Sequence, residues 1–194
     1  MDLSDTKIKS LPDNLEIRGD LDLMGTPIES LPNNLQVRGD LNLYYCKNLE
    51  YIGDNLKVGG YLNLSFTLIK SLPNNLEVGD YLFLSSTPIK SLPNNLQLGG
   101  SLYLVSTPIK SLPDNLQVRG DLNLGYTPIE SLPNNLQVRG DLHLSFTEIK
   151  SLPDNLQVGG ELYLKGAPIA KKLVGKSDEE LKKLFPGIKG DILY

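Results

Sequence analysis

Apolar and polar residues follow one another along this chain in a pattern that repeats every 20 residues. The repeated motif is S-L-P-[DN]-N-L-x-[VIL], and a degenerate copy surrounds Tyr51. Its intact copies begin at Ser10, Ser30, Ser71, Ser91, Ser111, Ser131 and Ser151. Self-similarity at such a period indicates a solenoid, because a short copy buries its apolar face only by stacking on its neighbours.

Within one copy, the apolar positions fit two short strands better than a helix. Leu116 and Val118 flank one polar position, as do Leu122 and Leu124, and alternate side chains of an extended chain share one face. Pro113 would break helical hydrogen bonding, so the third side of each coil is expected to be extended. The sequence predicts a mainly β solenoid of about eight coils, with neighbouring strands paired in a parallel sheet at roughly 4.8 Å.

A nearly constant glycine separates the two strands of each copy. The column reads Gly19, Gly39, Gly60, Asp80, Gly100, Gly120, Gly140 and Gly160. Aspartate is among the few residues that tolerate positive φ, so the column predicts a corner with a left-handed backbone.

The two ends of the chain differ in how they are protected. We expect residues 1–169 to form the solenoid and residues 170–194 to cap it. The first coil begins in mid-repeat at Met1 without a cap. Open strand edges seldom stay bare, so this edge is expected to pair with another copy in a homo-oligomer, or to be shielded by its own first residues.

A short helix is expected within the C-terminal cap. Ser177 and Glu180 have the spacing of a capping box, which predicts a helix from about Asp178 to Phe185. The apolar residues expected to cover the last coil are Leu181, Leu184 and Phe185, followed by Ile188, Ile192 and Leu193.

Composition narrows the class of protein. The chain has 194 residues, 40% of them apolar, and no run of roughly 18 apolar residues that could cross a membrane. No secretory signal follows Met1, so a cytoplasmic location and no membrane partner are expected. Cys46 is the only cysteine, which excludes an internal disulfide.

Charge is unevenly distributed along the chain. Residues 1–169 hold 13 basic and 19 acidic residues, or −6, whereas residues 170–194 hold 6 and 4, or +2. An acidic body opposes binding to a phosphate backbone. We therefore expect no nucleic-acid partner.

The stretch from Leu122 to Pro133 reads L-N-L-G-Y-T-P-I-E-S-L-P and resembles the leucine-rich repeat signature L-x-L-x-x-N-x-L-x-x-L-P. It is similar to the short 20-residue bacterial class, which occurs in secreted virulence effectors and in related phage and bacterial proteins. The resemblance covers residues 1–169. It implies a scaffold whose parallel sheet forms a concave face.

The chain departs from that signature at one column. Threonine replaces asparagine at Thr6, Thr26, Thr67, Thr87, Thr107, Thr127 and Thr147. An asparagine ladder is expected instead at Asn14, Asn34, Asn55, Asn75, Asn95, Asn115, Asn135 and Asn155. We expect these asparagines to bond buried turn backbone, and their Asp or Asn neighbours to face water. This departure leaves the curvature open, and a straighter β-helix stays an alternative.

The sequence offers little for catalysis, which needs a nucleophile with a base, paired carboxylates or a metal cluster. His143 is the only histidine, and it shares a column with surface residues such as Asn123. Cys46 stands where other copies have threonine. No enzymatic activity, cofactor or metal is therefore expected.

Aromatic residues gather on the predicted strand face in the middle coils. Tyr61, Tyr81, Phe83 and Tyr103 are expected to form an apolar centre, and Gly59, Gly79 and Gly99 replace the arginines that would cover them. An apolar centre with charged flanks is typical of protein interfaces. The residues predicted to bind a protein partner are Tyr61, Tyr81, Phe83, Tyr103, Asp121, His143 and Tyr163.

These features predict a non-catalytic protein-binding scaffold. A narrower form is a bacterial effector or a phage-encoded inhibitor that occupies a host protein, in which case the location is the host cytoplasm. The alternatives are a structural or oligomerising solenoid, whose aromatic rings merely stack across strands, and an enzyme or nucleic-acid mimic.

Overall fold

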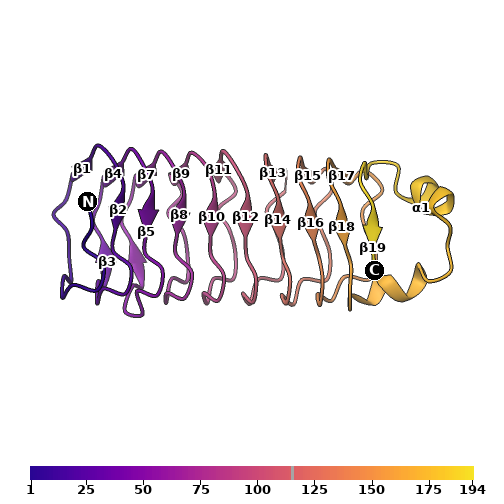
Figure 1. Cartoon of the computed structure of the whole chain (residues 1–194), viewed down its shortest axis with the longest axis horizontal. Helices are drawn as coiled ribbons and strands as arrows, with labels where there is room; N and C mark the ends of the chain where they lie inside the picture. Colours follow the sequence, from indigo (N-terminus) through magenta and orange to yellow (C-terminus); the bar gives the residue numbers. More distant parts are fainter. Residues whose placement is uncertain (115) are drawn as a thin grey trace.

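The computed structural model describes residues 1–114 and 116–194 of the chain. It is a parallel-strand β-solenoid whose coils stack along the long axis, with one short α-helix near the C-terminus (Figure 1). The predicted fold class is confirmed.

One side of the solenoid carries a nine-stranded parallel sheet, which the first coil joins only through a bridge between Asp2 and Asp22. Its strands are β2 (Leu21–Asp22), β5 (Leu41–Asn42), β8 (Leu62–Asn63), β10 (Leu82–Phe83), β12 (Leu102–Tyr103), β14 (Leu122–Asn123), β16 (Leu142–His143), β18 (Leu162–Tyr163) and β19 (Ile192–Leu193). Residues 20 positions apart pair directly, as Leu82 does with Leu102. Equivalent side chains of successive coils therefore form straight columns.

A second side of the coils carries further parallel pairs, in two separate sheets. The first contains β1 (Glu16–Ile17), β4 (Gln36–Val37), β7 (Lys57–Val58), β9 (Glu77–Val78) and β11 (Gln97–Leu98). The second contains β13 (Gln117–Val118), β15 (Gln137–Val138) and β17 (Gln157–Val158). On the third side, β3 (Ser30–Leu31) pairs with β6 (Tyr51–Ile52).

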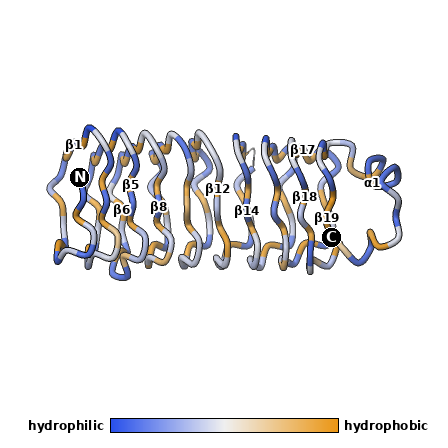
Figure 2. Tube along the Cα trace, in the orientation of Figure 1, coloured by the Kyte–Doolittle hydropathy of each residue, from blue (hydrophilic) through white to orange (hydrophobic). Residues whose placement is uncertain are grey.

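The core lies inside the coils and runs the length of the stack. Leu102 and Leu104 are completely buried, as are their equivalents in most other coils, and the same apolar positions recur from coil to coil in Figure 2. The threonine column is also buried: the Thr87 hydroxyl donates to the Leu84 carbonyl at 2.7 Å. Cys46 takes the threonine place in its coil, where burial raises the pKa of its thiol.

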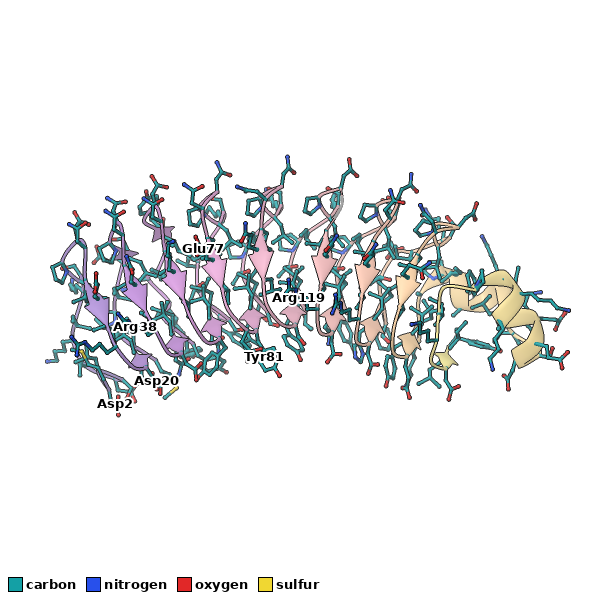
Figure 3. The ribbon with its side chains drawn as sticks, turned by 90° about the horizontal axis from the view of Figure 1, so that it is seen from above. Asp2, Asp20, Arg38, Glu77, Tyr81 and Arg119 are labelled. Atoms are coloured by element: carbon teal, nitrogen blue, oxygen red, sulfur yellow. The ribbon has the colours of Figure 1, made fainter. Side chains whose placement is uncertain are left out.

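The stack is nearly straight in Figure 1 but follows a shallow arc in Figure 3. The labelled Tyr81 lies on the inner side of that arc, as does Asp20. Both residues come immediately before strands of the nine-stranded sheet.

The glycine column between the strands is needed for a different reason from the one predicted. None of its glycines has positive φ, so the predicted left-handed corner is wrong. A Cβ on Gly140 would lie 2.8 Å from the main-chain carbonyl carbon of Gly120 in the preceding coil. Close stacking of the coils, and not local backbone conformation, therefore favours glycine in most of this column, although Asp80 occupies one place and a Cβ on Gly19 would meet nothing within 4 Å.

Positive φ occurs at two other columns instead. One is part of the asparagine column, where φ is 59° at Asn14, 57° at Asn34, 60° at Asn55 and 63° at Asn135. The other lies one residue before each threonine, where Tyr45 and Phe66 have φ of 61° and 60°. Asparagine tolerates this region, whereas bulky residues occupy it only rarely.

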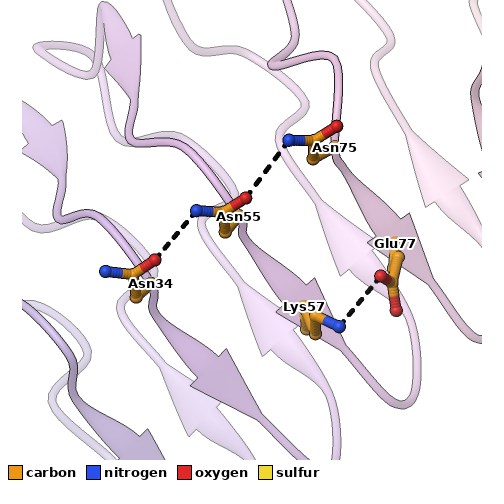
Figure 4. A network of polar contacts seen from close by, with 5 residues as sticks. All are labelled: Asn34, Asn55, Lys57, Asn75 and Glu77. Atoms are coloured by element: carbon orange, nitrogen blue, oxygen red, sulfur yellow. Dashed lines mark hydrogen bonds and ion pairs between the residues drawn. The ribbon is translucent and has the colours of Figure 1, made fainter.

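The asparagine column forms a ladder of side chains (Figure 4). The Asn34 amide donates to the Asn14 oxygen at 2.9 Å, Asn55 donates to Asn34 at 2.9 Å, and Asn75 donates to Asn55 at 3.2 Å. These side chains are largely exposed and bond one another. The Asn155 oxygen also accepts the N–H of Asn135 at 3.2 Å, but this main chain is exposed and not buried. The expected position Asn115 lies outside the described residues.

The Asp or Asn residue directly before each of these asparagines was expected to face water. In the first coils its side chain instead accepts a hydrogen bond from the main chain of the next coil. The Asp13 carboxylate accepts the N–H of Asn33 at 2.9 Å, and the Asn33 side-chain oxygen accepts the N–H of Asp54 at 3.0 Å. In the first coils the two columns thus have the reverse of their predicted roles: the asparagines bond one another along the stack, and their neighbours bond main chain.

The C-terminal segment caps the stack largely as predicted. Helix α1 (Asp178–Leu184) begins with the full capping box of Ser177 and Glu180. Leu181 is buried, but the prediction was wrong for Leu184, which is 50% exposed.

An additional strand, β19, continues the nine-stranded sheet, although the sequence did not predict it. Its Ile192 is half-buried while Leu193 is exposed. The short 3₁₀ helix η1 (Pro168–Lys172) spans the predicted boundary between residues 169 and 170. The cap is therefore joined to the solenoid by sheet pairing as well as by the chain.

Candidate functional site

The four central aromatic residues form one cluster on the outer surface of the nine-stranded sheet. Phe83 is its hub: its ring stacks on Tyr103 with centroids 4.8 Å apart, and it meets Tyr61 and Tyr81 edge-on at 6.1 Å each. Tyr81 is 42% exposed and the other three rings are half-buried. The structure thus brings together the four residues predicted as the apolar centre. We call Tyr61, Tyr81, Phe83 and Tyr103 the aromatic cluster.

Two of these rings occupy a position that stabilises the following turn in other coils. The side-chain oxygens of Asp22, Asn42, Asn63 and Asn123 accept the N–H two residues later, at 2.9 to 3.1 Å. Such a contact holds the chain in an Asx turn. Phe83 and Tyr103 stand at the same sheet position and have no acceptor in that place. These coils therefore lack one turn-stabilising hydrogen bond each.

The other two rings interrupt a second column of hydrogen bonds. Asp20 accepts the N–H of Asp40 at 2.9 Å, and Asp40 accepts the N–H of Tyr61 at the same distance. The pattern resumes where Ser101 accepts the N–H of Asp121 at 2.8 Å. Tyrosine replaces the short acceptor at positions 61 and 81, so the column stops beneath the aromatic cluster.

Asp121 belongs to this hydrogen-bonded column. Its carboxylate accepts the N–H of Asp141 at 2.9 Å, and the Asp141 carboxylate accepts the N–H of Glu161 at 2.8 Å. Asp121 is half-buried and lies two coils beyond Tyr81. The structure thus gives the predicted binding residue Asp121 a definite role in joining coils.

An acidic hollow adjoins the aromatic cluster on its N-terminal side. Tyr61 lines it together with Asp2, Asp20, Asp22 and Asp40. Burial, and next the charge of Asp40, raise the pKa of the Tyr61 hydroxyl. Figure 3 shows Asp2 and Asp20 on the same side of the solenoid as Tyr81. The apolar centre thus has an acidic flank.

The remaining predicted residues form a separate pair towards the C-terminus. The His143 ring stacks on Tyr163 with centroids 4.2 Å apart and an angle of 6° between the planes. The Tyr163 hydroxyl donates to the Glu161 carboxylate, which raises the pKa of Tyr163 to about 12. In the nine-stranded sheet, Asn123 pairs with Tyr103 on one side and with His143 on the other, so it separates this pair from the aromatic cluster.

The glycines that replace arginine do not uncover the aromatic cluster. Gly59, Gly79 and Gly99 line a groove on the neighbouring side of the coils, and no aromatic residue is among the residues that line it. Arg38 and Arg119, which occupy the same column, line that groove as well. The expectation that arginine in this column would cover the aromatic rings is therefore wrong.

A second row of aromatic residues escaped the sequence analysis. It lies at the turn after the nine-stranded sheet, where Tyr126 stacks on Phe146 at 4.7 Å and Tyr44 meets Phe66 at 5.4 Å. Tyr126 is 60% exposed. Phe66, Tyr126 and Phe146 each stand directly before a threonine in the sequence, and all three have positive φ.

Within the described residues, no group of three His, Cys, Asp or Glu side chains could hold a metal ion. The same part of the chain contains no helix with the length and apolar character of a membrane span. No protein-family model matches the sequence, and comparison with curated proteins gives no significant match. Function has to be inferred from the chain's own surface.

Proposed function

We propose that the protein is a non-catalytic scaffold that binds another protein through the aromatic cluster. The partner would present apolar side chains to Tyr81 and Phe83, and a lysine or arginine to the acidic hollow beside Tyr61. Aromatic residues with a charged rim are characteristic of protein interfaces.

The observation that carries this proposal is the loss of hydrogen bonds at the cluster. Several other coils use short acceptors at these positions to bind main-chain N–H groups, whereas His143 and Tyr163 do not. A hydrogen bond of this kind contributes about 1 kcal/mol. A solenoid selected for stability alone has no reason to give up these contacts in adjoining coils. Departures from a locally favourable pattern are expected at functional sites.

The size of the cluster suits the centre of an interface. Each aromatic ring offers about 150 to 250 Å², so four rings that are partly exposed give a patch of a few hundred Å². This is about the largest apolar patch that a monomer usually exposes. A stable interface buries about 800 Å² on each partner, which the acidic hollow and the rest of the sheet face would complete.

The resemblance to short leucine-rich repeats supports the same proposal, because it implies a scaffold that presents the face of its parallel sheet to a partner. In its narrower form, the chain is a bacterial effector or a phage-encoded inhibitor acting in the cytoplasm of a host cell. A partner protein of that cell would then occupy the aromatic cluster.

Capture of a partner tests the proposal. Replacing Tyr81, Phe83 and Tyr103 together by serine is expected to weaken capture by at least about tenfold, because such residues dominate binding energy. The matched control replaces Tyr126 and Phe146 by serine, which removes a stacked, exposed pair elsewhere. Melting temperatures of both variants separate binding from stability. Unchanged capture by the triple variant, with a lowered melting temperature, would leave the rings with a stabilising role only.

A second candidate function is self-association, favoured by the first coil. Leu3, Ile8 and Leu11 pack against the core but are only partly buried, whereas their equivalents Leu23 and Ile28 are completely buried. Stacking of a second molecule on this end would cover them.

Self-association is testable because it depends on concentration. Light scattering between about 5 and 100 μM should show the mass rising with concentration, and Leu3→Ser should reduce the rise. A constant monomer mass across this range would rule self-association out as the function of the first coil.

A further inference from the structure

A long hollow lies on a different side of the solenoid from the aromatic cluster. It is a groove with a volume of about 750 Å³, bounded by the strands β4, β7, β9, β11 and β13. Arg38 and Arg119 stand at its two ends. Volumes between about 300 and 1,000 Å³ are typical of ligand sites.

The floor of the groove is bare main chain. Gly59, Gly79 and Gly99 follow one another across it, and a Cβ on Gly79 would lie 2.0 Å from the Gly59 carbonyl oxygen. Arginine occupies the same column in the flanking coils, at Arg38 and Arg119. Glycines that stand directly after strands in successive coils leave room for another chain to approach the backbone closely.

The groove is a cationic site on an acidic body. Its charged residues are Arg38, Lys57, Arg119 and Glu77, which sum to +2, whereas residues 1–169 carry −6. Lys57 pairs with Glu77 at 2.9 Å. Neither arginine forms an ion pair with any described residue. Two guanidinium groups are therefore available to an anionic ligand, which they can bind bidentately.

One end of the groove also has an unmatched main-chain donor. The N–H groups of Gly99 and Arg139 donate to the carbonyls of Val78 and Val118, at 3.0 Å each. The equivalent N–H of Arg119 has no such partner within the described residues, because β11 and β13 do not pair there. Arg119 can therefore offer a main-chain N–H as well as its guanidinium to an anion.

We propose that this groove binds an extended acidic peptide segment, with one carboxylate near Arg38 and another near Arg119. Four coil steps of roughly 4.8 Å separate these arginines, or about 19 Å, which about six extended residues span. This binding is independent of the proposed function, because it uses other residues on another side of the solenoid.

The middle of the groove favours a peptide over a nucleic acid. Gln97 lies between the two arginines, and Gln36 and Gln117 lie in the end coils beside them. Their amides can both donate to and accept from a peptide backbone. The Glu77 carboxylate lies between the two arginines in coil order and would repel a phosphate chain that ran the length of the groove. A peptide can place charge at the two ends and neutral backbone between them.

Arginine signals in nuclear magnetic resonance provide a direct test, because the chain has only four arginines: Arg18, Arg38, Arg119 and Arg139. The probe is a glycine- and serine-based peptide with two glutamates about six residues apart. We expect saturable shifts of the Arg38 and Arg119 Nε–H signals, assigned with the variants R38Q and R119Q. The signals of Arg18 and Arg139 should stay in place.

Variants of the whole chain complete the test. The double variant R38Q/R119Q should weaken binding of this peptide by at least about tenfold, since charge-assisted hydrogen bonds are lost. Arg139 is in the same column as Arg119 but outside the groove, so R139Q should change the affinity for this peptide by less than about twofold. The proposal is overturned by no saturable binding up to millimolar peptide, by equal binding of the peptide with glutamine in place of glutamate, or by equal shifts of all four arginines. Tighter binding of a thymidine oligonucleotide through Arg38 and Arg119 would also overturn it, in favour of a nucleic acid.

Discussion

Replacing Gly99 by alanine is expected to lower the free energy of unfolding by about 3 kcal/mol, the upper range of overpacking effects. A Cβ at this position would lie 1.8 Å from the Gly79 carbonyl oxygen and 2.6 Å from its carbonyl carbon. Both atoms are main chain, so no side-chain rotation relieves the overlap. The coils would have to separate locally, which weakens the ladder on both sides.

Gly19 is the matched control for this change. A Cβ there meets nothing within 4 Å, and its φ is not positive. The alanine variant should be as stable as the natural chain, or more stable by up to about 1 kcal/mol, because alanine restricts the unfolded chain. Urea denaturation of both variants measures the difference. Equal losses at the two positions would mean that the coils are not stacked as closely as described.

The second large effect is expected in the core. Leu102→Ala should lower the free energy of unfolding by about 2 to 5 kcal/mol, as large-to-small changes in packed cores do. Leu102 is completely buried between its equivalents Leu82 and Leu122. Leu102 lies in a middle coil with neighbours on both sides, so the surrounding side chains cannot move in to fill the cavity that the change leaves.

Leu3→Ala provides the comparison for the core variant, because Leu3 stands at the end of the stack and is only partly buried. Leu3→Ala should lower the free energy of unfolding by less than half as much as Leu102→Ala, since each coil is stabilised by its nearest neighbours and the first coil has only one. Denaturant unfolding of the two variants checks this. A loss at Leu3 as large as that at Leu102 would contradict end-to-end stacking of coils with one continuous core.

Regular features of the fold were predictable from the sequence because each depends on local pattern. The alternation of Leu122 and Leu124 indicated inward-facing strand positions, and both are completely buried. The 20-residue period fixed which residues meet in the sheet, so Phe83 and Tyr103 were expected to be neighbours. The spacing of Ser177 and Glu180 predicted the start of α1.

Other features depend on distances between coils, which no local pattern reveals. Glycine at position 140 suits both a left-handed turn and a close approach of main chains, and only the second is present. The chain turns between the two strands of each coil, next to Gly79, and this turn places the arginine column on the neighbouring side of the solenoid. The sequence pattern does not show this placement, so the groove was not predicted. Strand β19 lacks the repeat motif, and its register follows from pairing with β18.

The candidate site was predictable to the extent that it follows the columns. Tyr61, Tyr81, Phe83 and Tyr103 lie in two outward columns of adjoining coils, which sufficed to predict that their rings meet. The hydrogen bonds that Asp121 makes to the next coil were not foreseen, because they require the carboxylate to lie directly beneath an N–H of that coil.

Site-specific photo-crosslinking tests the central claim most directly. Tyr81 is replaced in one variant by photoreactive p-benzoylphenylalanine, and Tyr126 is replaced in another; both side chains are exposed, but only the first belongs to the aromatic cluster. If the cluster binds a protein, illumination in lysate should give an adduct of one discrete mass at position 81, suppressed by additional Phe83→Ser, and none at position 126. Adducts of the same kind and yield at both positions, or at position 126 alone, would contradict binding through the aromatic cluster.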